Sequence, residues 1–323
     1  MNDFGTGALP SKKDKRTVKN EELAFVGIPL VKGGREYLPK DIEHQHKVGI
    51  CTAISLIQLR QKQTGKQYSP EWQYLCQKKL YDGNWYEGSS IFSALKVAKN
   101  IGFLPAKEWT WTDEQDRYLP YANYISKLKI PDTEFERLRR LCVDKIAGYA
   151  SVDVNDSQAM AKAINESEAG ILCRYECGST WWLPSWKPSD INPLRKPNPA
   201  TSGHAIDMIG FNYSLCSSQK LANTWGTKWC MQGQADIIHS IYAPTESWTI
   251  LRENPMFKFT KTLYFRMRNP EVKKLQKRLN MPTWLNTGYF WLITRKYVKN
   301  YQRSKGLVAD GIVGSRTRAS LNQ

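Results

Sequence analysis

The chain contains 323 residues, of which 41% are hydrophobic and 12% aromatic. This composition excludes an intrinsically disordered protein, and the length allows a sizeable core and about two domains. The mean hydropathy is -0.55, and no run of about eighteen apolar residues occurs, which excludes a membrane span. With 47 Lys and Arg against 30 Asp and Glu, the net charge of +17 predicts an anionic partner: nucleic acid, membrane or cell-wall polymer.

The positive charge is concentrated at the C-terminus. Residues 271–323 contain eleven Lys and Arg and two acids, so +9 of the +17 lies in the last 53 residues. This asymmetry predicts a basic C-terminal module attached to a less charged body.

The N-terminus is polar and rich in Lys as far as about residue 18. It lacks the apolar stretch of a secretory signal peptide. We therefore expect residues 1–20 to form a flexible tail and the chain to be synthesised in the cytoplasm, with any export by another route.

Apolar periodicity and capping residues predict four helices in the first half of the chain. Before them, short apolar patches around two glycines suggest one or two strands between Leu23 and Pro39. The helices are predicted at 51–62, from Ser89 or Ser90 to Gly102, at 132–146, and after Asp156.

Strands are predicted in the second half. Three apolar segments, at 170–175, 204–211 and 256–267, have the composition of strands. Helices followed by strands predict an α+β fold with two segregated lobes. A Pro- and Trp-rich loop at 179–202 separates the first two strands; it is a candidate lid or subsite, and simple packing explains it equally well.

Asn269-Pro270-Glu271 predicts a helix start and a domain boundary, because it combines a cap, a Pro at the first helical position and an acid in the first turn. A second helix is expected from Thr294 to Gly306 and a third at 315–321. The predicted domains are a tail at 1–20, a body at 21–268 and an all-α three-helix module at 269–323.

Cys51 is the candidate nucleophile. It opens the first predicted helix, where unpaired N–H groups and the helix dipole favour a thiolate. Gln45 lies six residues earlier, and its side-chain amide could join the Cys51 N–H in stabilising an oxyanion. A lone cysteine is more often a small buried hydrophobe, so the assignment also needs a base.

His204 is the candidate base among the four histidines. It begins an apolar strand directly after Gly203, and Asn223 follows nineteen residues later. An Asn side-chain oxygen can accept the second imidazole N–H and orient the ring. Asp207 is a poorer orienter, since strand alternation points it to the opposite face from His204.

Three blocks of sequence resemble the signatures of papain-like cysteine peptidases, in the order that the family has them. They are Gln45 with Gly49-Ile50-Cys51, then Gly203-His204-Ala205-Ile206, then Asn223-Thr224-Trp225-Gly226-Thr227-Lys228-Trp229. The resemblance covers about residues 24–268. It implies a two-lobed papain-like fold with a helical left lobe and a β-rich right lobe.

The resemblance also implies roles for individual residues. Cys51 would be the nucleophile, His204 the base and then the acid, Asn223 the orienter of His204, and Gln45 the oxyanion donor. Such a site forms an acyl-thioester that water releases, and it needs no cofactor.

Substrate contacts follow from the same resemblance. Gly88-Ser89-Ser90 is similar to the family's segment whose backbone pairs with an extended substrate, so Gly88 and Ser89 are candidate substrate-binding residues. Trp225 would shield the hydrogen bond between His204 and Asn223.

Four positions depart from the family pattern without removing a catalytic group: Val48 in place of a frequent disulfide cysteine, Thr52 in place of an aromatic residue, Gly203 in place of an Asx residue, and Cys230 in place of a glycine. They place the chain in a distant branch and leave its substrate open. About 44 residues precede Gln45, fewer than the family's long inhibitory pro-segment. We therefore expect activity without proteolytic activation, or another means of control.

The other cysteines are expected to be structural. Cys142 lies on an apolar helix face. Cys173 and Cys177, on one strand, would be about 13 Å apart, too far for a disulfide or a shared zinc, so no metal site is predicted. The state of three more is left open: Cys76, Cys216 and Cys230.

Nearly all of residues 270–323 resembles the three-helix peptidoglycan-binding domain, the alternative being an unrelated basic bundle. The most specific part is Asp310-Gly311-Ile312-Val313-Gly314, followed by Thr317. The resemblance implies a glycan site formed by the loop with Gly288 and Tyr289 and the turn with Asp310 and Gly311.

Together these features predict a monomeric cysteine endopeptidase that hydrolyses peptide bonds and is held on bacterial peptidoglycan. Without a signal peptide it fits an endolysin or virion-associated lysin, delivered by a holin or by the particle. One alternative is a non-catalytic wall-binding or virion structural protein on a decayed scaffold. Others are an amidase or acyl transferase with the same triad, and a nucleic-acid-binding protein, for which no motif is present.

Overall fold

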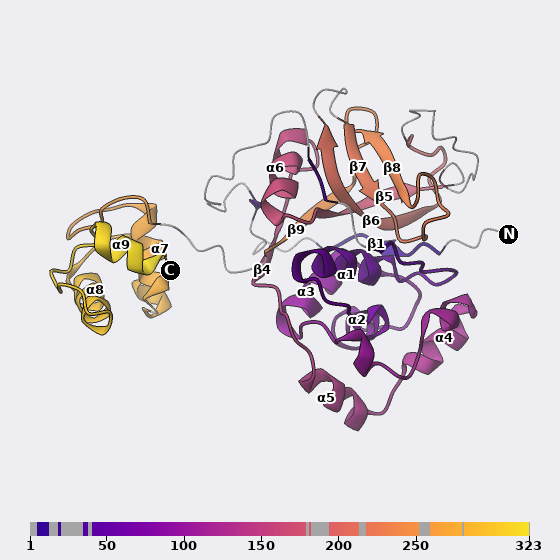
Figure 1. Ribbon diagram of the computed structural model, residues 1–323, viewed down its shortest axis with the longest axis horizontal. Helices are drawn as coiled ribbons and strands as arrows, with labels where there is room; N and C mark the ends of the chain where they lie inside the picture. The colour runs from indigo at the N-terminus through magenta and orange to yellow at the C-terminus, as the bar shows by residue number, and fades with distance from the viewer. Residues whose placement is uncertain are drawn as a thin grey trace. The chain divides into compact units, whose positions relative to one another are not determined.

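The computed structural model describes residues 5–12, 19–20, 35–37, 41–178, 181, 194–212, 218–251, 259–279 and 281–322. These residues divide into two compact units (Figure 1). One unit holds the described residues up to Leu251, and the other holds those from Phe259 onward.

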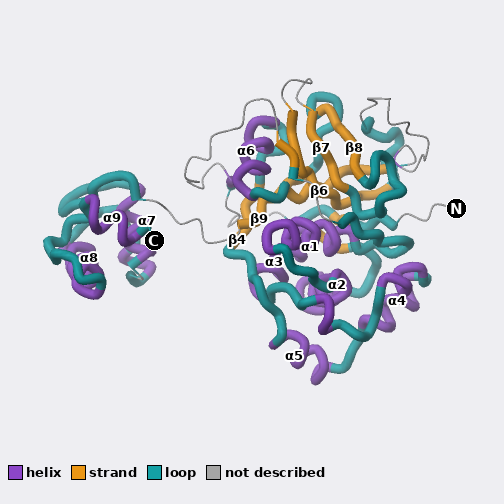
Figure 2. The backbone as a smooth tube through the Cα atoms, in the orientation of Figure 1, coloured by secondary structure: helices purple, strands orange, loops and turns teal. Residues whose placement is uncertain are grey.

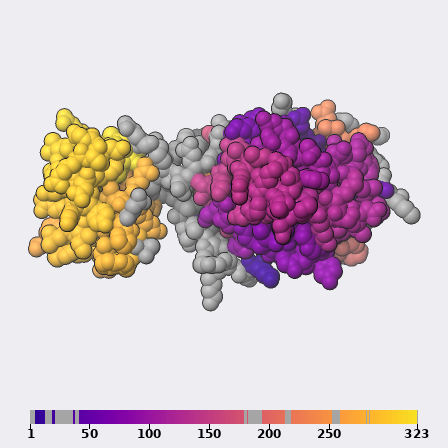
Figure 3. Space-filling view, turned by 90° about the horizontal axis from the view of Figure 1, so that it is seen from below, coloured from indigo at the N-terminus to yellow at the C-terminus, as the bar shows by residue number. Residues whose placement is uncertain are grey.

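The first part of the N-terminal unit is helical, and its surface fills much of the view in Figure 3 in purple and magenta. Its helices are α1 (Cys51–Thr64), α2 (Pro70–Gln77), α3 (Ile91–Asn100), α4 (Tyr121–Leu128) and α5 (Asp132–Arg140), with a π-helix at Lys78–Asp82 and 3-10 turns at Ala106–Glu108 and Glu114–Tyr118. Within the described ranges, no helix is both long and apolar enough to cross a bilayer.

The helices predicted at 51–62 and from Ser89 or Ser90 to Gly102 are confirmed as α1 and α3. Ser90 caps α3, since its hydroxyl accepts the N–H of Ser93 at 3.1 Å. The helix predicted at 132–146 is too long: α5 ends at Arg140, because the backbone of Val143 pairs with that of Phe103 and cannot continue a helix.

The second part is an antiparallel sheet with strand order β4-β9-β5-β6-β7-β8 and β2 beside β6 (Figure 2). The strands are β2 (Arg35–Glu36), β4 (Gly148–Ser151), β5 (Ile171–Cys177), β6 (Ser202–Asn212), β7 (Ser218–Ala222), β8 (Gln234–Ile238) and β9 (Glu246–Leu251), and one helix, α6 (Ser157–Ser167), follows β4. The strands predicted at 170–175 and 204–211 and the helix after Asp156 are confirmed, and so is the α+β class. Of the segment predicted as strand at 23–39, only 35–37 lie among the described residues.

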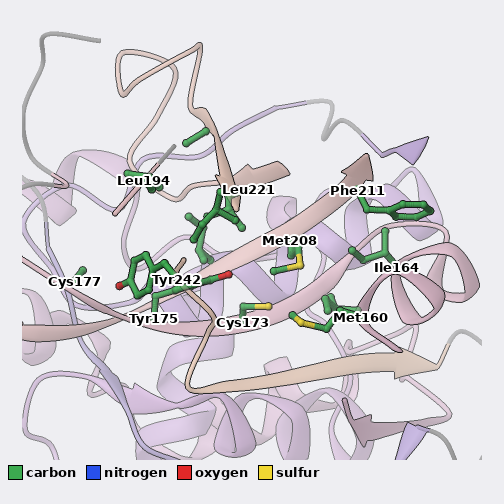
Figure 4. Packing of buried hydrophobic residues seen from close by; sticks show 14 of the residues in the cluster. Met160, Ile164, Cys173, Tyr175, Cys177, Leu194, Met208, Phe211, Leu221 and Tyr242 are labelled. Atoms are coloured by element: carbon green, nitrogen blue, oxygen red, sulfur yellow. The ribbon is translucent and has the colours of Figure 1, made fainter. Parts of the chain in front are cut away.

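Three buried clusters hold this unit together. One packs α6 against the sheet, with Met160, Ile164 and Met208 in contact (Figure 4). A second fills the helical part around Trp72. The third joins residues of α1 and α3 to residues of β5, β6 and β9, and it contains Cys51. Cys51 is therefore placed at the boundary between helices and sheet.

The N-terminal segment 5–12 is not the predicted flexible tail. Its strand β1 (Ala8–Leu9) pairs in parallel with β3 (Ser89–Ser90), directly before α3. Ala8 is buried in the same cluster as Cys51. The segment is ordered because its backbone finds partners on both sides of the helix–sheet boundary.

The C-terminal unit is a small three-helix structure. It contains α7 (Pro270–Arg278), a 3-10 turn at Thr283–Leu285, α8 (Leu292–Ser304) and α9 (Ser315–Leu321). Asn269 caps α7 as predicted, with its side-chain oxygen 2.9 Å from the N–H of Glu271. Thr294 is not a cap: it lies buried inside α8, which begins two residues earlier.

This unit begins before the predicted boundary at residue 269. Phe259 and Leu263 belong to its core with Val272 and Phe290. The strand predicted at 256–267 is absent from its described part, 259–267, where Leu263 makes only an isolated bridge to Val313.

Candidate active site

Cys51 is the first residue of α1, preceded by a cap residue, Ile50, that offers no side-chain hydrogen bond. Its sulfur therefore lies near the free N–H groups at the helix start. It also lies 3.5 Å from the backbone N of Ala205, the residue after His204. Burial nevertheless dominates and raises the pKa of the Cys51 thiol to about 12, although the N–H of Ala205 opposes this shift.

The protonation of the His204 ring follows from its partner. His204 Nε2 lies 2.6 Å from Asn223 Oδ1, which also accepts the N–H of Thr224 at 2.7 Å. Because that atom accepts from Thr224, it is the amide oxygen, and Nε2 of His204 must carry a proton. The other ring nitrogen, Nδ1, is buried without a hydrogen-bond partner in the described structure and has a free lone pair. It is therefore the atom able to take a proton from a thiol.

Aromatic rings cover the His204–Asn223 pair. Trp225 stacks on the His204 ring with a centroid separation of 4.4 Å, and Trp181 meets the same ring edge-on at 6.1 Å. Burial among these rings lowers the pKa of His204 to about 4, and the hydrogen bond that its ring donates to Asn223 only partly opposes this shift. Trp181 packs as a core residue here; most of the Trp-rich loop 179–202 lies outside the described residues.

Gln45 points its amide nitrogen at a backbone carbonyl of the N-terminal segment. Its Nε2 donates to Gly5 O at 2.7 Å and to Val48 O at 3.0 Å, and its oxygen accepts a short hydrogen bond from the Thr224 hydroxyl. Trp225 Nε1 donates to the same Gly5 oxygen at 3.0 Å. Gly5 O is thus held by two side-chain donors, one from Gln45 and one from Trp225.

The remainder of the segment runs across the site. Gly7 N–H donates to Gly203 O at 3.1 Å, and Gly7 O accepts from Ser89 N–H at 2.9 Å. Ala8 O accepts from Arg174 Nε at 2.9 Å. Cys51, His204, Asn223 and Gln45 are all 0% exposed. The structure therefore brings the four predicted catalytic residues together in a site that is already filled.

Gly88 and Ser89 contact the segment in different ways. Ser89 supplies a backbone hydrogen bond, whereas the N–H and C=O of Gly88 are taken by Tyr74 Oη at 3.0 Å and Lys78 Nζ at 2.8 Å. Gly88 instead permits close approach, since a Cβ there would lie 2.3 Å from Gly7 O, and its φ of +86° disfavours other residues.

Sequence reasoning missed two buried charges that support the site. Arg117 pairs with Glu71 at 2.7 Å and Glu43 at 3.3 Å and donates to His44 O at 2.8 Å, which anchors the loop carrying Gln45. Lys78 holds the loop before β3. Neither lies in a motif, so only their three-dimensional contacts reveal them.

Asp207 is buried apart from His204, as strand alternation predicts. Gln58, on α1, donates to its Oδ2 at 3.1 Å and reaches Asn223 O at 3.5 Å, while Oδ1 of Asp207 has no partner in the described structure. Burial raises the pKa of Asp207 well above its ordinary value.

Asp207→Asn is expected to gain stability relative to the wild type as the pH rises above about 4. The folded state keeps a proton on Asp207 that the unfolded chain releases, so the wild type loses up to about 1.4 kcal/mol per pH unit until Asp207 ionises. Asparagine carries no such cost. Urea unfolding at about pH 5 and about pH 8 measures the difference; a difference that does not grow with pH would contradict a neutral Asp207.

The other described cysteines are free thiols. Cys173 and Cys177 are free and buried, and so is Cys76; Cys142 and Cys230 are free and half-buried. Cys216 lies outside the described residues. Among the described residues, no group of three or more His, Cys, Asp or Glu is arranged to hold a metal.

In the C-terminal unit, three of the four predicted glycan-binding residues support loops. Gln276 accepts the N–H of Gly288 at 3.0 Å, and Gln302 accepts that of Gly311 at 2.9 Å. Asp310 Oδ1 accepts from Gln302 and from the N–H of Ile312, both at 2.8 Å. Through these contacts, Gly288, Gly311 and Asp310 stabilise the loops in which they lie.

Tyr289 is the exception because its side chain lines a cavity of about 290 Å³. Trp291 stacks on Tyr289 at 5.5 Å and lines the same cavity. The remaining lining residues are Gln276, Met281, Leu285, Thr287, Ile293 and Thr294. A larger cavity of about 360 Å³, beside the end of β4 and the start of β9, is lined by none of the predicted site residues.

Comparison with known families identifies the C-terminal unit. Residues 268–321 match the family described as a putative peptidoglycan binding domain. No curated protein sequence matches the chain.

Solved structures show the fold of the N-terminal unit. Xylellain, a cysteine protease from Xylella fastidiosa, is 20% identical, with a TM-score of 0.57 over 77% of this chain and 97% of that one. The digestive procathepsin L2 proteinase of Tenebrio molitor is 12% identical, with a TM-score of 0.52 over 77% and 78% of the two chains. The ragweed allergen Amb a 11, a cysteine protease solved in its proform, is 13% identical, with a TM-score of 0.50 over 73% and 70%. These structural similarities show that the N-terminal unit has a papain-like fold.

Proposed function

We propose that this chain, a papain-like fold followed by a peptidoglycan-binding domain, is a cysteine endopeptidase acting on bacterial cell walls. One observation carries the proposal: Cys51, His204, Asn223 and Gln45, distant in sequence, meet in one site. The ring nitrogen of His204 that can accept a proton is Nδ1. The next residue along the chain is Ala205, and its N–H contacts the Cys51 sulfur.

The chemistry follows from these positions. Cys51 gives its proton to His204 Nδ1, and the thiolate attacks the carbonyl carbon of the substrate. The N–H groups of Gln45 and of Cys51 stabilise the oxygen anion that forms. His204 then protonates the leaving amine, and a water molecule that gives its proton to His204 hydrolyses the thioester. Asn223 keeps the ring in the required tautomer throughout.

The C-terminal unit would bind the enzyme to the cell wall. Stacked aromatic rings beside a small apolar cavity suit a sugar face and its acetyl group, so we assign glycan binding to Tyr289 and Trp291. Eleven basic residues in 271–323 add attraction to wall carboxylates and phosphates. The chain would act as a monomer at the wall, as an endolysin or virion-associated lysin, with the boundary between its two domains lying between Leu251 and Phe259.

Purified sacculi test both halves of this proposal. The wild type, or a variant with an open cleft, should release fragments whose new ends mass spectrometry locates at peptide bonds. Cys51→Ala should bind sacculi without cutting them, and Trp291→Ala should retain cleavage of soluble peptides but lose at least about tenfold in wall affinity. Cleavage of proteins with intact sacculi would reject the wall substrate.

The alternatives give different results in the same experiment. Cleavage at the bond between sugar and peptide would indicate an amidase with the same triad. A decayed scaffold would leave Cys51 no more reactive toward a thiol-reactive peptide probe than Cys142. Binding to DNA in preference to sacculi would assign the net charge to a nucleic-acid partner.

A further inference from the structure

The cleft around Cys51 is lined by glycines. A Cβ on Gly49 would lie 2.5 Å from Thr6 O, one on Gly88 would lie 2.3 Å from Gly7 O, and one on Gly203 would lie 2.2 Å from Ala8 O. These distances are too short for any side chain, so the backbone of the bound segment packs directly on the backbone of the walls.

The segment in the cleft, residues 5–8, also has glycines at which a side chain would not fit. A Cβ on Gly5 would lie 2.5 Å from Val48 O, and one on Gly7 would lie 2.8 Å from Gly49 O and 2.9 Å from the Cα of Gly88. Its next residue, Ala8, is 2% exposed, so its methyl group is already enclosed. The cleft therefore encloses a Gly-Thr-Gly-Ala sequence with no space at two positions and space for a methyl group at a third.

Side chains hold these walls in place by hydrogen bonds, one from the exposed Glu87 and others from the buried Tyr74 and Lys78. Glu87 Oε1 accepts the N–H of Gly49 at 2.7 Å, so the residue before Gly88 holds the opposite wall. Gly88 is held in turn by Tyr74 and Lys78. A wider side chain in the cleft would have to break these bonds.

We propose that this cleft selects peptides with glycine at two positions and alanine at a third beside the reacting bond, with a larger residue accepted between the two glycines as Thr6 is, and that Glu87 is the positioning residue that keeps the walls too close for larger side chains at the other positions. The proposal rests on the function proposed above and narrows its substrate class. It uses the chain's own segment as the occupant that reveals the size of the subsites.

The test uses the full chain with the segment displaced by Gly7→Leu, and by Gly5→Val as a second route. Two quenched peptides with identical flanks are compared, one with a glycine and alanine centre and one with leucine at those positions. We expect kcat/KM to be at least about tenfold higher for the glycine and alanine peptide. Adding Glu87→Ala should reduce this ratio severalfold through the KM of the leucine peptide, whereas Glu87→Gln keeps an acceptor oxygen and should preserve it.

The possible failures are distinguishable. Equal or faster cleavage of the leucine peptide overturns the selectivity while leaving the peptidase intact. Cleavage of neither peptide contradicts the proposed function, and selectivity is then decided by fluorescence anisotropy of the same labelled peptides on Cys51→Ala combined with Gly7→Leu. There, tighter binding of the leucine peptide overturns the inference, and tighter binding of the glycine and alanine peptide supports it.

Discussion

Replacing Gly7 with leucine should increase the alkylation rate of Cys51 at neutral pH by about a hundredfold or more. A side chain at this position would lie within 3 Å of the backbone of Gly49 and Gly88, so the segment cannot stay in the cleft. While it is bound, burial raises the pKa of Cys51 to about 12 and lowers that of His204 to about 4, which keeps both groups neutral at pH 7. Each unit by which the thiol pKa falls on exposure increases the thiolate about tenfold.

Alkylation by iodoacetamide, followed at the Cys51 peptide by mass spectrometry, measures this effect, and peptide hydrolysis should rise with it. Gly314→Leu is the matched control, because a Cβ there meets no atom within 4 Å and its φ is negative. Equal labelling of wild type and Gly7→Leu would mean that the segment does not restrict access to the sulfur. The control of activity would then have to come from something other than this segment.

The elements that carry Cys51 and His204 were predictable because their signals are local. The buried apolar residues of α1 recur at helical spacing, although its cap Ile50 offers no side-chain hydrogen bond, and the apolar run after Gly203 suffices for a buried strand. The bound segment was not predictable in this way. Gly5-Thr6-Gly7-Ala8 has no apolar pattern, and its order comes from hydrogen bonds to residues more than 35 positions away.

Two departures from the family pattern acquire a physical reason in the structure. Gly203 stands where an Asx is common, and any side chain there would collide with Ala8 O and Arg174. Cys230 replaces a glycine and adopts a φ of +46°, the left-handed region that glycine favours. Gly203 is needed because the segment 5–8 packs against it, and the sequence alone did not reveal that contact.

The loops of the C-terminal unit could have been recognised as a repeat. Gln276 donates to Tyr289 O and to the Thr294 hydroxyl, and Gln302 donates equivalently to Ile312 O and to the Thr317 hydroxyl. In both cases the Thr follows the loop glycine by six residues. This spacing was visible, but a buried Gln is unusual enough that only the contacts show its role.

Gln45→Ala should lower kcat about 10²–10³-fold in a chain whose cleft is open, with little change in KM. The amide nitrogen lies 2.7 Å from Gly5 O, and in the proposed mechanism it would donate in the same way to the substrate oxygen, where it acts mainly on the charge that develops in the transition state. The measurement compares Gly7→Leu with Gly7→Leu combined with Gln45→Ala. Thr224→Val, which removes the hydroxyl bonded to Gln45 but leaves the amide, should cost less.

In the wild-type background, Gln45→Ala should make the Cys51 sulfur more accessible to reagents. Gly5 O is held by Gln45 and by Trp225, so losing one donor weakens the grip on the segment and should raise alkylation of Cys51 even as catalysis falls. A purely structural role for Gln45 would loosen the fold and raise alkylation of the buried Cys76 and Cys173 as well as that of Cys51. A rise confined to Cys51, with catalysis reduced, would show that one amide serves two ligands in turn, the chain's own carbonyl when the cleft is closed and the substrate's when it is open.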